Sequence, residues 1–231
     1  MPGLAAQTER AVRVSTPTAR IARFTLTERL AHWLLAVSFF VMLGSGLLLS
    51  EYLPGVIDRP TAKAWHLWSA LALPIGVVVL MVIGNRKSLM KSAAEIDRFD
   101  RDDAQFLSPA RIAARKPTPP QGRFNGGQKI NTILTFGLLA VMFLTGFFLW
   151  YGEQDTRFRF AGTIYIHDWL TYALIILVGG HLYMAMLNPK TRHSLRGMAI
   201  GDVDREWAEQ HHSKWVGQEG QTPLSRTDDN A

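Results

Sequence analysis

The chain of 231 residues contains no cysteine, and its 25 lysines and arginines outnumber its 19 acidic residues. The lack of cysteine excludes structural disulfides, iron–sulfur ligation and c-type haem attachment within this chain. The length alone would suit one or two soluble domains, but four apolar runs of about 20 residues, each long enough to cross a hydrocarbon core of roughly 30 Å, predict a membrane protein instead.

The N-terminal part of the chain is polar. Residues 1–22 are expected to form a mobile segment, and a membrane domain is expected over 23–190. The first span is predicted at about 30–50, with His32 near its beginning. Because it follows a long polar segment and lacks a small-residue cleavage pattern, we expect an uncleaved span and not a signal peptide.

A short loop with two prolines leads to the second span, predicted at about 64–84. His66 stands near the beginning of this span, and the membrane helix is expected to tolerate Pro74. The loop 85–128 ends in a proline cluster and a glycine pair, "ARKPTPPQGRFNGGQK", which favours irregular surface structure over another domain.

The C-terminal half contains the last two spans, predicted at about 129–151 and 162–187. The third has no histidine, whereas the fourth contains His167 and His181. The tail 191–231 is expected to be soluble, with a short amphipathic helix in "WAEQHHSKW". Three further histidines lie in this tail and are expected to make surface or partner contacts: His193, His211 and His212. No internal repeat is apparent.

The distribution of basic residues predicts the orientation in the membrane. Lysine and arginine number 21 in residues 1–29, 85–129 and 188–231, against 4 in the two connections 51–63 and 152–163. By the positive-inside rule, both termini and the loop 85–128 face the cytoplasm. The basic charge is then a topogenic signal, and no nucleic-acid partner is expected.

With this topology, the four histidines of the spans fall at two depths. Fourteen residues separate His167 from His181, which corresponds to a rise of about 21 Å and a rotation to within roughly 40° of the starting direction. The two side chains therefore share one face of the helix. His66 matches the depth of His167, and His32 matches that of His181.

Two imidazoles at each of two depths suit a low-spin haem b held between helices, one ligand from each side. A zinc site would usually add cysteine or carboxylate ligands, and a proton relay would need more acidic residues than Asp168. Taken singly, His32 and His66 could instead be interfacial anchors.

Small residues near the ligands would let a flat macrocycle approach the backbone: Gly44, Gly46, Gly146, Gly179 and Gly180. Arg23 and Arg29 are candidates for pairing with haem propionates, although positive-inside placement explains them equally well.

Several motifs resemble the cytochrome b556 (gamma) subunit of membrane-bound formate dehydrogenases, over nearly the whole chain beyond its first twenty residues. They are "ERLAHW", "KAWHLW", "RFNGGQK", the helix with His167 and His181, and "WAEQHHSKW". The histidine spacing is shared with the wider group of di-haem cytochrome b subunits of nickel–iron hydrogenases and thiosulfate reductases.

This resemblance implies a four-helix bundle with two haems b in a bacterial inner membrane. It assigns His66 and His167 to the iron of an outer haem, and His32 and His181 to that of an inner haem. By motif match it also points to a quinone site at Asn125, Gly127 and Gln128, although turn chemistry alone would explain these residues.

The implied function is electron transfer in anaerobic respiration. Formate would be oxidised on a molybdenum or tungsten (alpha) subunit, and electrons would pass through an iron–sulfur (beta) subunit and both haems to menaquinone or ubiquinone.

Three alternatives stay open. Two are electron-transfer proteins, a hydrogenase cytochrome b and a stand-alone di-haem cytochrome b, and the third is a haem-free membrane anchor. A transporter is the least supported reading, because no span has a buried acidic residue or a broken-helix pair apart from Pro74.

Overall fold

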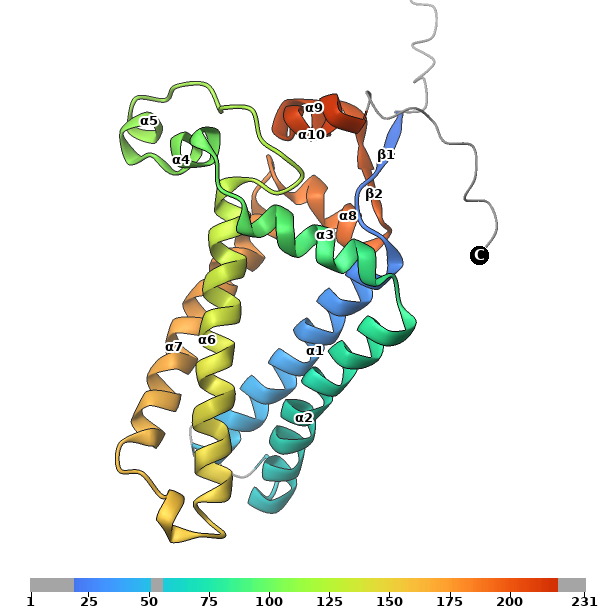
Figure 1. The fold of residues 1–231 in the computed structure, drawn as a ribbon. Helices are drawn as coiled ribbons and strands as arrows, with labels where there is room; N and C mark the ends of the chain where they lie inside the picture. Colours follow the sequence, from blue (N-terminus) through green and yellow to red (C-terminus); the bar gives the residue numbers. More distant parts are fainter. Residues whose placement is uncertain (1–18, 51–55, 220–231) are drawn as a thin grey trace, which may run out of the picture.

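The computed structural model describes residues 19–50 and 56–219. Four long helices dominate it (Figure 1). They are α1 (Leu26–Leu49), α2 (Arg59–Ile83), α6 (Gly126–Tyr151) and α7 (Thr163–Leu182), the last continued by a π-helical turn, η2 (Tyr183–Leu187). All four are long and apolar enough to cross a membrane, which confirms the prediction of four apolar helices.

Polar residues ahead of the apolar runs cap the first turns of three of the long helices, α1, α2 and α6. Thr25 and Glu28 form a reciprocal capping box at the start of α1, and Asn125 and Gln128 form the same arrangement at the start of α6. Asp58 caps α2, with its side chain accepting a hydrogen bond from the backbone N–H of Thr61. These helices therefore extend a few residues beyond the apolar runs on their N-terminal sides.

The long helices pack as two pairs. Helix α1 lies along α2, and α6 lies along α7, while contacts between the pairs are sparse along most of their length (Figure 1). Apolar side chains on the outer faces are strongly exposed; Val78 and Val82 of α2 are 61% and 77% exposed. A soluble protein rarely exposes such continuous apolar surface, so these faces are suited to lipid.

Shorter elements gather mostly at one end of the helix pairs (Figure 1). They are β1 (Arg20–Ala22), α3 (Arg86–Asp97), α4 (Arg101–Leu107), α5 (Pro109–Ala113), η3 (Arg192–Ser194), α8 (Leu195–Ala199), β2 (Asp202–Asp204), α9 (Arg205–His211) and α10 (Ser213–Glu219). We call this end the capped end. The other end, where α1 leads to α2 and α6 leads to α7, is the open end; among the described residues it holds only the short η1 (Thr156–Phe158).

The capped end joins segments from both termini of the described chain. Strand β1 pairs antiparallel with β2, with Ile21 opposite Val203. Residues 20–22 are thus part of a sheet, although the sequence predicts mobility for the whole of 1–22; residues 1–18 lie outside the described part. Around β2, a small core forms from Val203, Trp207, Ala208, Trp215 and Val216.

The motif "WAEQHHSKW" forms two short helices and not one. Helix α9 ends at His211 and α10 begins at Ser213, so His212 occupies the corner between them. The corner turns the His212 side chain inward, and it is only 2% exposed. The expectation of a surface histidine is therefore wrong for His212, because Trp207 and Trp215 close over its ring.

Buried ion pairs attach the central loop to the long helices. Arg123 donates to Glu28 of α1 at 2.9 Å and to Glu95 of α3 at 2.7 Å. Lys129 of α6 donates to Asp103 of α4 at 2.6 Å, with both side chains at most 10% exposed. The loop that the sequence predicts as irregular thus contains three helices, and two of them are tied to the bundle by charge pairs.

Candidate cofactor-binding cavity

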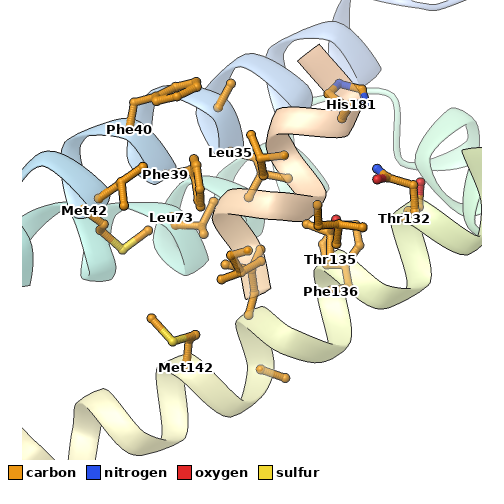
Figure 2. A pocket seen from close by; sticks show the side chains of 18 of the residues that line it. Leu35, Phe39, Phe40, Met42, Leu73, Thr132, Thr135, Phe136, Met142 and His181 are labelled. Atoms are coloured by element: carbon orange, nitrogen blue, oxygen red, sulfur yellow. The ribbon is translucent and has the colours of Figure 1, made fainter. Parts of the chain in front are cut away.

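A cavity of about 3520 Å³ lies between the two helix pairs and reaches the capped end. Residues of all four long helices line it. Figure 2 shows Leu35 and Phe39 of α1, Leu73 of α2 and Phe136 of α6 around this space. Pockets for single small ligands usually measure about 300–1,000 Å³. The cavity therefore has room for more than one large ligand.

Four histidines line the cavity in two facing pairs. Near the open end, the ring centroids of His66 on α2 and His167 on α7 lie 6.2 Å apart. Nearer the capped end, those of His32 on α1 and His181 on α7 are also 6.2 Å apart. We call these the open-end pair and the capped-end pair. The structure thus brings together the histidines that are predicted to lie at the same depth.

The spacing within each pair matches two ligands on opposite sides of one metal ion. A histidine–metal bond is about 2.0–2.1 Å long, and a ring centroid lies roughly 1.2 Å behind the ligating nitrogen. Two opposed imidazoles on one ion would therefore have centroids roughly 6.4 Å apart. The observed 6.2 Å in both pairs is close to this value.

Hydrogen bonds at the open-end pair leave one nitrogen of each ring available. His66 Nδ1 donates to the Met42 carbonyl at 3.0 Å and lies 3.1 Å from Ser45 Oγ. His167 Nδ1 lies 2.9 Å from Thr145 Oγ1. With the proton held on Nδ1, the lone pair of Nε2 is free to bind a metal.

Glycine lies directly against each ring of the open-end pair. A Cβ atom added to Gly46 would lie 3.4 Å from His66 Cε1, and one added to Gly146 would lie 3.4 Å from His167 Cε1. A larger side chain at either position would fill the space beside the imidazole. By contrast, added Cβ atoms at Gly44, Gly179 and Gly180 meet nothing within 4 Å, so the structure gives those glycines no contact with the histidines.

The donor set suits a planar macrocyclic metal complex better than a bare ion. Within residues 19–50 and 56–219, no three His, Cys, Asp or Glu side chains come together as a metal site. Zinc sites in proteins need three or four protein ligands. A haem needs only two axial ligands, since its ring supplies the other four, and the pairs of imidazoles in an apolar cavity fit that requirement.

Asn125, Gly127 and Gln128 line the cavity near the capped end. Asn125 Oδ1 accepts from the Gln128 backbone N–H at 2.9 Å, and Gln128 Oε1 accepts from the Asn125 backbone N–H at 3.0 Å. The two side-chain oxygens therefore cap α6. The two amide nitrogens have no hydrogen-bond partner among the described residues, so they remain available as donors.

Of the two arginines considered for propionates, only Arg23 lines the cavity. Its Nη2 donates to the Arg123 carbonyl at 2.7 Å, whereas its buried Nε and Nη1 atoms have no partner in the described part of the chain. Burial and the nearby Arg123 charge lower the pKa of Arg23 to about 9, so it remains charged at neutral pH. Arg29 instead donates to the Ala199 carbonyl at 2.5 Å.

The tail histidines differ from one another. His193 is exposed, whereas His211 stacks on Trp207 with centroids 4.9 Å apart. His211 and His212 lie at the capped end of the cavity. Burial, and then the charge of Arg23, lower the pKa of His212 to about 3. Its ring is therefore neutral at physiological pH.

Comparison with known proteins agrees with the resemblance seen in the motifs. A family model described as prokaryotic cytochrome b561 matches residues 23–201. The formate dehydrogenase cytochrome b556(fdo) subunit of Escherichia coli K12 is 24% identical over 206 residues, which cover 84% of this chain and 91% of the relative. The nitrate-inducible b556(Fdn) subunit of the same organism is 23% identical over 220 residues, covering 84% and 89%. A formate dehydrogenase cytochrome b556 subunit of Haemophilus influenzae is 24% identical over 217 residues, covering 90% and 87%.

Proposed function

The chain belongs to the prokaryotic cytochrome b561 family, and we propose that it is the membrane cytochrome b subunit of a formate dehydrogenase that delivers electrons to quinone. This proposal rests on the open-end and capped-end histidine pairs. In each, two imidazole rings face each other with centroids 6.2 Å apart, in a cavity between four apolar helices. The names of its relatives in two organisms supply the formate dehydrogenase assignment.

Each imidazole pair holds one haem b in this proposal. His66 and His167 are the axial ligands at the open end, and His32 and His181 are those at the capped end. When bound, the haems supply one-electron carriers at two depths, through which electrons cross the bilayer. The protein orients the ligands, excludes water with apolar side chains and leaves room for the macrocycles.

The quinone site lies at the capped end, at Asn125, Gly127 and Gln128. Quinone carbonyl oxygens are hydrogen-bond acceptors, and the Asn125 and Gln128 amide nitrogens are the matching donors on the cavity wall. Reduction of quinone consumes two electrons and two protons. Since Lys and Arg are concentrated in the segments of the capped end, this end faces the cytoplasm of a bacterial inner membrane, and the protons come from there.

The partner subunits are arranged accordingly. Formate is oxidised on a molybdenum or tungsten (alpha) subunit, where it becomes CO₂, one proton and two electrons. An iron–sulfur (beta) subunit then passes these electrons to the open end of this chain. The chain itself makes or breaks no bond of formate; it anchors the complex and conducts electrons.

Spectroscopy of the purified complex tests this function. A dithionite-reduced minus oxidised spectrum, with haem measured as pyridine haemochrome, should give two b-type haems per chain. Formate should then reduce both haems, and added quinone should reoxidise them. Haem reduction by hydrogen gas in place of formate would assign the chain to a hydrogenase, and a chain that binds no haem after haem-replete expression would be a membrane anchor.

A further inference from the structure

The open-end and capped-end histidine pairs differ in what their rings contact. At the open end, the Nδ1 atoms of His66 and His167 both have protein oxygen atoms within 3.1 Å. At the capped end, the ring nitrogens of His32 and His181 have no hydrogen-bond partner among residues 19–50 and 56–219. Because all four histidines have the same chemistry, this difference comes only from the surrounding residues.

The hydroxyl groups near the open-end pair act as acceptors. Thr145 Oγ1 lies 2.9 Å from the Val141 carbonyl of its own helix, which takes the single hydroxyl proton. The same oxygen must then accept from the His167 Nδ1–H, 2.9 Å away. Ser45 repeats this arrangement in part: its Oγ donates to the Val41 carbonyl at 2.6 Å and, at 3.1 Å, shares the His66 Nδ1–H with the Met42 carbonyl.

We propose that Ser45 and Thr145 lower the reduction potential of the open-end haem below that of the capped-end haem. This inference rests on the proposed haem ligation. A hydrogen bond accepted from Nδ1–H makes the imidazole a more basic ligand. Reduction adds one electron to the iron, and a more basic ligand stabilises the ferric ion relative to the ferrous ion. The potential of the haem with both ligands so bonded is therefore the lower one.

The direction of this difference fits the direction of electron flow. Electrons that enter at the open end meet the lower-potential haem first and move to the higher-potential haem beside the quinone site. The hydroxyl groups thus favour forward transfer across the bilayer. They are positioning residues that act through the histidines and do not contact the iron.

Redox titration of the full complex in membranes tests the proposal. The open-end wave is identified as the one that is lost in His66→Ala. In Thr145→Val, which keeps the side-chain shape, this wave should move to higher potential while the capped-end wave stays in place. Ser45→Ala should move it less, because His66 Nδ1 keeps its hydrogen bond to the Met42 carbonyl. Thr145→Ser, which retains the hydroxyl, should keep the wild-type potential.

Matched controls lie one turn from each ligand. Thr171 Oγ1 donates to the His167 backbone carbonyl, and Ser69 Oγ donates to those of Trp65 and His66, so neither hydroxyl contacts a ring. Thr171→Val and Ser69→Ala should leave both waves in place.

An unshifted open-end wave in Thr145→Val with both haems bound would overturn this inference alone. If Thr145→Val loses the open-end haem, Thr145→Ser decides: a bound haem at wild-type potential supports the hydroxyl, and its loss overturns the role. Absence of haem from the wild-type chain would instead refute the proposed function.

Discussion

The ring of His66 faces that of His167 at a centroid distance of 6.2 Å, although the two residues belong to different helix pairs. Their helices make few direct contacts, so nothing in the packing of α2 against α7 alone holds the rings together. A shared ligand would give this facing arrangement a physical basis, because one metal ion would bind both rings and cross-link the helix pairs.

Single substitutions of the four cavity histidines should remove haems in a defined pattern. We expect His66→Ala and His167→Ala each to lose the same haem, and the double variant to lose no more than either single variant. His32→Ala should lose the other haem, and combining it with His66→Ala should leave none. Pyridine haemochrome per mole of chain measures this. Two haems retained in His181→Ala would contradict the pairing.

A bulky residue at Gly146 should exclude the open-end haem. The space beside the His167 ring accommodates at most a Cβ atom, at 3.4 Å from Cε1, so Gly146→Ala should be tolerated while Gly146→Leu should lose one haem of two. Gly137 offers a control on the same helix, because a Cβ added there meets nothing within 4 Å. Haem content and the amount of protein in membranes are the measurements. Equal haem content in Gly146→Leu and Gly137→Leu would show that the glycine does not shape the site.

The ion pair between Lys129 and Asp103 should matter for stability. In Lys129→Met, the Asp103 carboxylate would be left without its charged partner, and such a loss costs about 3–5 kcal/mol for a buried pair. The double variant Lys129→Met with Asp103→Leu should regain part of this stability, since no buried charge is then left unpaired. The thermal unfolding midpoint of the detergent-solubilised protein reports the change.

Lys63 provides the control for that prediction. Its ion pair with Glu153 is exposed, with side chains 41% and 53% accessible, and exposed pairs contribute about 0–1 kcal/mol. Lys63→Met should therefore barely change the unfolding midpoint. A loss as large as that of Lys129→Met would mean that the removal of lysine, and not the burial of the pair, causes the effect.

The sequence predicts the long helices well because their signal is strong and local. A run of about 20 apolar residues has few other stable structures in a membrane. The capping box of Thr25 and Glu28 has a local sequence pattern too, "TLTE" ahead of an apolar run, although we predict no cap there from the sequence. The depths of His32 and His181 follow from helix rise and the predicted topology, and the structure places these two residues opposite each other.

Contacts between segments that are distant along the chain could not be predicted from the sequence. Ser45 and Thr145 resemble any hydroxyl residues that bond to their own helix, and only the position of the neighbouring helix shows that they also contact imidazoles. One sequence signal was present: each is followed by a glycine that lies against the same ring. The burial of His212 depends on the turn between α9 and α10, which periodicity does not reveal.

Docking of the tail helices should weaken below about pH 6.5 because of His212. Its Nδ1–H donates to the Gly122 carbonyl at 2.7 Å, and its Nε2 accepts from Arg23 Nη2 at 3.2 Å. The pKa in the docked state is about 3, below the ordinary 6.5. Between these values the undocked state binds more protons, so the docking free energy falls as pH drops, by at most about 1.4 kcal/mol per pH unit.

Amide hydrogen exchange over residues 205–219, corrected for the intrinsic rate at pH 7 and pH 5, measures this docking. Wild-type protein should exchange faster at pH 5, whereas His212→Gln, which can still donate to Gly122 and accept from Arg23, should show no such change.

Arg23, with a pKa of about 9, stays charged throughout this range. The pKa of Asp100 is held below its usual 3.8 by Lys214, so its pair with Lys214 is lost only at lower pH. His193→Gln, at an exposed position, should keep the wild-type response; if it abolished the response as fully as His212→Gln, the buried imidazole would not be the titrating group.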